Sequence, residues 1–259
     1  MTTAAVGHPL RTRRTTTPVA MPFLEVRSHG ARRAIAPARR EFAELYAALS
    51  PDDQRRLARK RVILDILPKD VPLTDIPGFF DLRHDTSDEK HPRKYDTTRA
   101  MTSRYGRVIH SAIDETHVTK PTRNRRFRDY PYLRGYAISH EGSHVVHVGA
   151  ISRAQNTTVG ELYKARMAGD GLWVDQYAKT DVSEYFAESA SAFWHRPPFA
   201  HSYAKPRSKH PDPQPVLRRY TPAWLRTNDP EMYRLLSEVY PGRAKQIDAH
   251  RSHAARALQ

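Results

Sequence analysis

The chain has 259 residues, and its 43 Lys and Arg outnumber its 28 Asp and Glu, which gives a formal net charge of +15 at pH 7. It contains no cysteine, which excludes disulfides, thiolate metal ligands and cysteine nucleophiles. No apolar run reaches the roughly 18 residues of a transmembrane helix, and residues 1–11 lack the apolar block of a secretory signal. We therefore expect no membrane span. We expect export by a non-classical route or injection into a target cell, and otherwise a cytoplasmic protein.

The N-terminal segment is strongly basic. Residues 1–40 hold eight arginines against one glutamate, together with several prolines and threonines. Such a composition is too polar to form a core, so we predict a disordered basic arm over residues 1–37 and a similar basic tail over residues 246–259. The arm is suited to an anionic surface or to delivery machinery. Phosphate contacts with nucleic acid are an alternative use, although the chain has no zinc-finger spacing, RNP-like aromatic stretch or glycine-rich phosphate loop.

Two helices are predicted next. Residues 38–49 place Phe42, Leu45 and Leu49 at helical spacing. Ser50, followed by Pro51 and two aspartates, is a strong helix start, because it combines a cap, a proline in the first turn and acids at the positive end of the helix dipole. We expect this second helix to end before Pro68 and to serve as scaffold.

The following segment is predicted to be mostly irregular. Residues 69–103 are rich in Pro, Asp and His and indicate a loop with a short apolar patch at 76–82. Residues 107–113 alternate enough to suggest a strand. Residues 123–130 interleave basic and aromatic side chains, which fits either a phosphate-binding segment or a solvated approach to the next helix.

The stretch 132–150, predicted as a helix, contains His140-Glu-Gly-Ser-His144. Positions i and i+4 of a helix lie one above the other, so His140 and His144 can bind one metal ion. Glu141 can then act as general base on a water at that metal, which is the chemistry of the HExxH zinc peptidases. The residue frequencies of this chain, with its 14 His, give about a 3% chance of an accidental HExxH.

A zinc site of this kind needs a third protein ligand. His147 shares the helical face of His140, but three ligands along one straight helix span about 10 Å, too far for one small ion. The chain also does not continue as HExxHxxGxxH. Glu184 is the second candidate. It lies in residues 181–194, a predicted amphipathic helix capped by Asp181.

Glu184 and Glu188 form an i,i+4 pair of like charges, which is unfavourable on a plain helix. A metal bound by Glu184 would relieve this repulsion, and Glu188 could accept a hydrogen bond from the far nitrogen of a ligand histidine. The alternative is two solvated glutamates on a surface helix.

The pairing of HEGSH with Glu184-Tyr-Phe-Ala-Glu188 resembles the anthrax lethal factor-type zinc metallopeptidases, whose motif is HExxH followed by a helix reading E-F-F-A-E. The resemblance covers roughly residues 95–240 and extends loosely to 228–240, which is similar to the closing helix of the family. It implies that Glu184 is the third zinc ligand and that Glu188 supports the ligands. It also implies that Tyr177, seven residues before Glu184, assists the transition state. Tyr185 departs from the usual phenylalanine but keeps an aromatic ring.

These observations together predict an α+β fold: a mostly helical zincin-like domain with a small sheet beside the HExxH helix. We predict a gluzincin-type metallopeptidase domain over residues 38–245, with its core at roughly 95–240. The strand at 107–113 is expected to form the sheet edge that pairs with an extended substrate. Residues 196–215 are expected to be an irregular linker, followed by short helices at 221–226 and 230–240.

The predicted function is that of a monomeric, Zn²⁺-dependent endopeptidase, a secreted or injected effector or toxin that cleaves a protein or peptide substrate. In it, His140, His144 and Glu184 hold the metal, Glu141 is the base and Tyr177 assists. The alternative is a basic protein that binds nucleic acid or an anionic surface and has a non-catalytic metal site. A DNA-associated metalloprotease completed by a third histidine is a further possibility.

Overall fold

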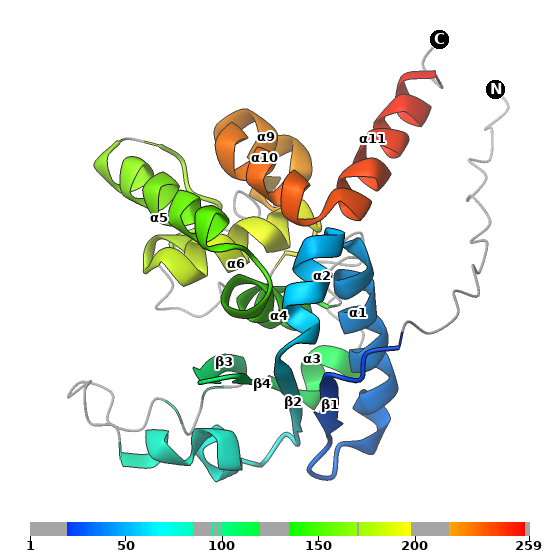
Figure 1. The fold of residues 1–259 in the computed structure, drawn as a ribbon, viewed down its shortest axis with the longest axis vertical. Helices are drawn as coiled ribbons and strands as arrows, with labels where there is room; N and C mark the ends of the chain where they lie inside the picture. The colour runs from blue at the N-terminus through cyan, green and yellow to red at the C-terminus, as the bar shows by residue number, and fades with distance from the viewer. Residues whose placement is uncertain are drawn as a thin grey trace, which may run out of the picture.

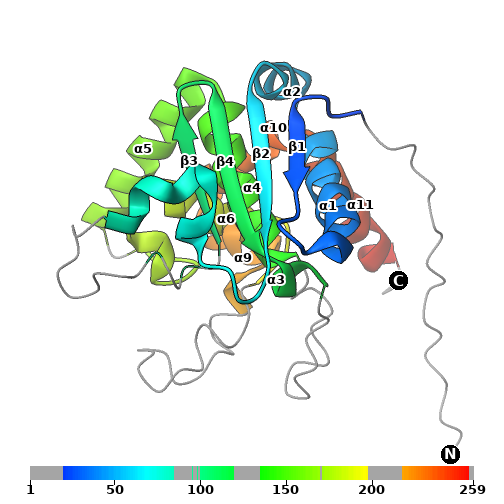
Figure 2. The same ribbon diagram turned by 90° about the horizontal axis from the view of Figure 1, so that it is seen from below.

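The structure is a computed structural model that describes residues 20–84, 95, 98, 100–119, 135–169, 171–197 and 218–256. α-Helices cover one face of a four-stranded sheet, and the 3₁₀ helices η2 (Leu73–Asp75) and η3 (Pro77–His84) pack on the other (Figures 1 and 2). The predicted α+β class with a small sheet is therefore confirmed. In the described part of the chain, no helix combines the length and the apolar character needed to cross a membrane.

The sheet has the strand order β1-β2-β4-β3. Strands β1 (Leu24–Arg27), β2 (Arg61–Leu67) and β4 (Val108–Asp114) are parallel, whereas β3 (Ala100–Tyr105) runs antiparallel to β4. The strand predicted at 107–113 exists, but its assignment to the sheet edge was wrong, because β4 lies between β2 and β3. The edge strands are β1 and β3, and β3, the edge strand beside β4, begins inside the predicted loop.

The helix predicted from Ser50 toward Pro68 was wrong in its second half. Helix α2 (Pro51–Ala58) does begin at Ser50, whose Oγ accepts a 3.1 Å hydrogen bond from the backbone N–H of Asp53. It ends at Ala58, and residues 61–67 form β2. Six of the seven residues of β2 are buried, the pattern of an internal parallel strand covered on both faces.

The predicted disordered ends are also partly wrong. Phe23 and Leu24 are buried at the start of β1, and helix α1 (Ile35–Ala48) already begins within the predicted arm. At the other end, the predicted tail belongs to helix α11 (Pro241–Arg256), which contacts α1. Residues 1–19 and 257–259 lie outside the described residues.

Helix α4 (Tyr136–Gly149), which carries HEGSH, lies between the sheet and helix α6 (Val182–Phe193). Gly142 allows α4 to approach α1 closely, because a Cβ there would stand 2.6 Å from Cδ1 of Leu45. Eleven of its fourteen residues are buried, which makes α4 a central helix of the core.

The remaining helices complete the layer above the sheet (Figure 1). Helices α9 (Pro222–Asn228) and α10 (Pro230–Val239) match the two predicted closing helices. The short α3 (Glu115–Thr119) and the longer α5 (Arg153–Ala168) were not predicted. Helix α5 does carry a local start signal, a capping box between Ser152 and Gln155. The predicted segment 123–130 and most of the predicted linker 196–215 lie outside the described residues.

Candidate metal centre

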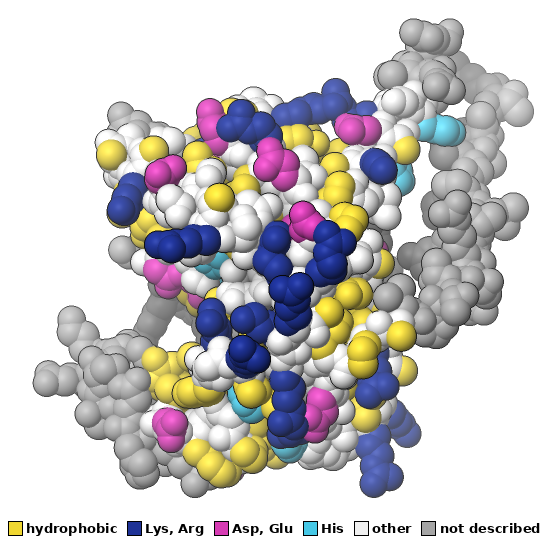
Figure 3. Space-filling view, in the orientation of Figure 1, with side chains coloured by type: hydrophobic (Ala, Val, Ile, Leu, Met, Phe, Trp, Pro, Cys, Tyr) yellow, Lys and Arg dark blue, Asp and Glu magenta, His cyan; other side chains and the backbone are white. Residues whose placement is uncertain are grey.

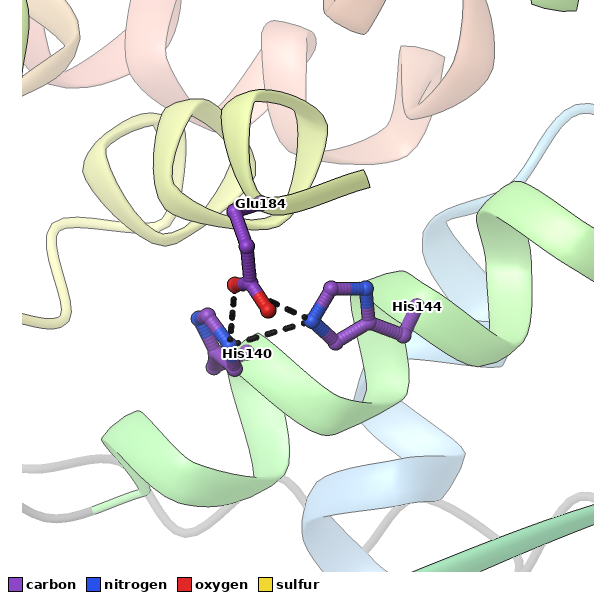
Figure 4. A group of neighbouring side chains, drawn as sticks. All are labelled: His140, His144 and Glu184. Atoms are coloured by element: carbon purple, nitrogen blue, oxygen red, sulfur yellow. Dashed lines mark hydrogen bonds and ion pairs between the residues drawn. The ribbon is translucent and has the colours of Figure 1, made fainter. Parts of the chain in front are cut away.

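His140 and His144 lie one turn apart on α4, and Glu184 reaches them from the first turn of α6 (Figure 4). The two histidine Nε2 atoms are 3.1 Å apart. Oε2 of Glu184 lies 3.1 Å from Nε2 of His140 and 3.4 Å from Nε2 of His144. Residues forty positions apart in the sequence therefore present three potential ligand atoms to one point.

The spacing of these atoms matches a zinc site. With metal–ligand bonds of about 2.0–2.1 Å, two ligands of a tetrahedral zinc ion are separated by about 3.4 Å. The three observed separations are 3.1, 3.1 and 3.4 Å. Two imidazole nitrogens and one carboxylate oxygen are also a donor set that zinc uses when one position is left open. The residues present therefore fit a zinc ion.

The sequence around Glu184 explains its position. Asp181 caps α6, and its Oδ1 accepts hydrogen bonds from the backbone N–H groups of Ser183 (2.7 Å) and Glu184 (2.9 Å). This cap starts the helix three residues before Glu184 and directs the carboxylate toward α4. The predicted cap is confirmed.

Both histidines are oriented through their second nitrogen. Nδ1 of His140 lies 3.2 Å from Oε1 of Glu188, and Nδ1 of His144 lies 2.8 Å from Oγ of Ser183. These contacts leave both Nε2 atoms facing Glu184. Glu188 is fully buried and also accepts a 2.5 Å hydrogen bond from the hydroxyl of Tyr136. Glu188 therefore lies beside the second nitrogen of His140, and its support of a metal ligand stays a prediction.

The cluster is a buried region that favours positive charge. Burial acts to raise the pKa of Glu184, but hydrogen bonds from His140 and His144 outweigh it and hold that pKa well below its usual range. Burial acts to lower the pKa of His140, but Glu188 and Glu184 outweigh it and raise that pKa well above 6.5. A divalent cation would satisfy the same carboxylates.

Glu141 follows the first histidine and is 3% exposed. Its Oε2 accepts a 2.7 Å hydrogen bond from Oγ1 of Thr102 on β3. Burial raises the pKa of Glu141, opposed by the two histidines and by Thr102. Thr102 was not predicted, because no local pattern distinguishes one threonine in a segment expected to be a loop.

Tyr177 starts a 3₁₀ turn, Tyr177–Lys179, that ends two residues before Asp181, the cap of α6. Its hydroxyl donates a 3.0 Å hydrogen bond to Oε1 of Glu184, and the residue is 48% exposed. Burial of the hydroxyl and the charge of Glu184 raise its pKa, so the phenol keeps its proton. His147, in contrast, lies outside the His/His/Glu group and stacks on the ring of Phe186 at 4.7 Å.

Comparisons with known proteins give one result. No protein family model matches the chain, and no curated protein matches its sequence. Among solved structures, the Pro-Pro endopeptidase PPEP-2 from Paenibacillus alvei aligns with 84% of this chain and 97% of its own, at 15% sequence identity and a TM-score of 0.45. The resemblance to lethal factor-type peptidases stays a prediction.

Proposed function

We propose that the chain is a zinc-dependent endopeptidase in which His140, His144 and Glu184 hold the metal. The observation that carries this proposal is the meeting of their three ligand atoms at 3.1–3.4 Å with Glu141 beside them on α4. Zinc bound there would supply Lewis acidity, polarising a peptide carbonyl and making a water molecule more acidic.

Glu141 is the proposed general base. Its carboxylate takes a proton from the attacking water and passes that proton to the amide nitrogen as the peptide bond breaks. A carboxylate with a raised pKa is suited to this role, because it holds the proton more firmly between the two transfers. Thr102 orients the carboxylate by donating to Oε2.

Tyr177 is the proposed donor to the oxyanion that develops on the scissile carbonyl. Its half-exposed ring lies at the site, because the ring centroids of Tyr177 and His140 are 6.0 Å apart, and its hydroxyl keeps its proton. A donor that engages charge only as it develops stabilises the transition state more than the substrate.

The substrate is proposed to be an extended protein or peptide segment that adds to the edge strand β3. In the described residues no strand other than β4 pairs with β3, and strand addition along its other edge is the proposed mode of substrate binding. Thr102 connects that strand directly to Glu141. We further propose a monomeric effector or toxin, exported or injected, for which the basic N-terminal residues serve as a delivery segment.

The experiment that tests the proposal compares the wild type with Glu141→Gln and Glu184→Ala. The wild type is expected to contain one zinc per chain by elemental analysis and to cleave a peptide library. Glu141→Gln should keep the zinc and lose cleavage, whereas Glu184→Ala should lose the zinc. Full cleavage by Glu141→Gln would contradict the mechanism. Proteome-wide identification of new N-termini, with Glu141→Gln as the blank, then identifies the substrate.

A second candidate function is binding to an anionic polymer or surface. A pocket of about 550 Å³ at the start of β2 is lined by four basic residues, Arg59, Lys60, Arg61 and Arg107, and by one carboxylate, Glu25. Lys and Arg side chains gather near the centre of the face in Figure 3. In the described residues, no ion pair involves Arg59, Lys60 or Arg107. Steeply salt-dependent DNA binding without zinc would favour this function.

A further inference from the structure

We propose that Tyr220 is a positioning residue that connects the ligand histidine His140 to the turn that carries Tyr177. The inference rests on the proposed function, which it extends by a residue far from both motifs. Tyr220 directly precedes the cap of α9, and no pattern in the sequence singles it out.

The hydroxyl of Tyr220 contacts two buried carboxylates. It lies 2.5 Å from Oε2 of Glu188 and 2.7 Å from Oδ2 of Asp175. All three residues are at most 1% exposed. The ring also meets that of Tyr136 edge to face at 6.4 Å. The phenol has one proton, so it donates to one carboxylate at a time, and the two carboxylates share this donor. In this buried, water-free environment, a hydrogen bond to a charged group is strong and restricts the geometry of both partners.

Through Glu188, Tyr220 is connected to the metal centre. Oε1 of Glu188 lies 3.2 Å from Nδ1 of His140, whose Nε2 faces Glu184. By holding Oε2, Tyr220 fixes the rotation of the Glu188 carboxylate and so the orientation of the imidazole. Groups that hydrogen-bond directly to a zinc ligand, the position of Glu188, commonly change zinc affinity about 10–100-fold. Tyr220 acts one contact further out, so we expect its effect at the lower end of this range.

Through Asp175, Tyr220 is also connected to the turn that carries Tyr177. Oδ1 of Asp175 accepts a 2.8 Å hydrogen bond from the backbone N–H of Ala178, the residue after Tyr177. That bond fixes the turn, and Tyr220 in turn holds the second oxygen of Asp175. One phenol therefore orients both the helix that binds the metal and the turn that presents the proposed oxyanion donor.

Tyr220→Phe tests the connection, because it keeps the ring and removes only the hydroxyl. The matched control is Tyr185→Phe, which removes the hydroxyl of another fully buried tyrosine that donates to a buried carboxylate, Asp229 at 2.7 Å. Zinc affinity is measured by chelator competition. The kinetic constants kcat and KM are measured on the zinc-saturated protein, and circular dichroism checks that the metal-free protein is folded.

We expect Tyr220→Phe to weaken zinc binding about tenfold, the lower end of the range for direct partners of a zinc ligand, and to lower kcat more than it raises KM. Tyr185→Phe should change zinc affinity less than threefold. Combining Tyr220→Phe with Tyr177→Phe should lower kcat by less than the product of the two single effects, because both act on one group. Wild-type zinc affinity in Tyr220→Phe would overturn the inference.

Asp175→Asn provides a second test if Tyr220→Phe does not fold, because it preserves volume, removes the charge and replaces the acceptor oxygen that faces Tyr220 by an NH2 donor. It is expected to lower kcat at least threefold, and an unchanged kcat would overturn the inference. Zinc affinity separates this inference from the proposed function. If the wild type binds zinc, His144→Ala does not bind it, and the wild type cleaves no peptide, then only the peptidase proposal is contradicted.

Discussion

Thr102 on the edge strand β3 donates a 2.7 Å hydrogen bond from its Oγ1 to Oε2 of Glu141 on α4. The residue proposed to move the proton is therefore held by the strand proposed to hold the substrate. Oγ1 of Thr102 also lies 3.0 Å from Oγ of Ser111 on β4, and because its one proton goes to Glu141, it accepts from the Ser111 hydroxyl. The threonine side chain is therefore itself fixed by the sheet.

Replacing Thr102 by valine should affect the base and not the metal. The loss of a hydrogen bond to the charged carboxylate raises the pKa of Glu141 further above its usual value. Because Glu141 acts in its ionised form, the acid limb of the kcat/KM profile should move to higher pH, and kcat should fall about tenfold. Thr102→Ser, which keeps the hydroxyl, is the control. An unmoved acid limb in Thr102→Val would contradict the role.

Replacing Tyr177 by phenylalanine should lower kcat and leave KM nearly unchanged. Removing one donor to a developing oxyanion commonly costs about 100-fold in kcat. Zinc affinity should fall as well, because Tyr177 donates to Oε1 of Glu184, the carboxylate whose Oε2 is the proposed ligand atom, and partners of a ligating carboxylate help to orient it. Steady-state kinetics and chelator competition check this prediction. A rise in KM at constant kcat would instead assign Tyr177 to substrate binding.

Removing the metal should destabilise the protein as well as inactivate it. A ligand present at about 1,000 times its Kd contributes about 4 kcal/mol to the free energy of unfolding. EDTA should therefore lower the melting temperature of the wild type, and added zinc should restore it. The melting temperature of His144→Ala should not respond to EDTA. Equal sensitivity in both proteins would place the metal elsewhere.

His147 should make the apo protein sensitive to acid. Burial lowers its pKa from 6.5 to about 4, so between these values the unfolded chain binds a proton that the folded protein does not. The stability present above pH 6.5 is lost as the pH falls toward 4, by about 3 kcal/mol. His147→Phe, which can still stack on Phe186, should remove this part of the loss. Denaturant unfolding of both proteins in EDTA at several pH values measures this loss. If the free energy of unfolding of the wild type and of His147→Phe depends on pH in the same way, the loss does not come from His147.

Local sequence signals predicted the parts of the fold that depend on neighbouring residues. The i,i+4 spacing of His140 and His144, the Ser50 and Asp181 caps and the closing helices all act within one or two turns, and the structure contains each of them. The sheet was harder to predict. Residues 61–67 form β2 because they are enclosed by two parallel neighbours, and that enclosure is set by contacts with β1 and β4.

By itself, the sequence determined a possible metal site: two histidines on one helical face, a glutamate between them and a second helix with Glu184 and Glu188. Only the tertiary structure decided that α4 and α6 cross closely enough to bring three ligand atoms within 3.4 Å of one another. It also brought Thr102, Asp175 and Tyr220 to the site. These side chains come from a strand and two loops distant in the chain, and their positions follow from packing, which no local spacing encodes.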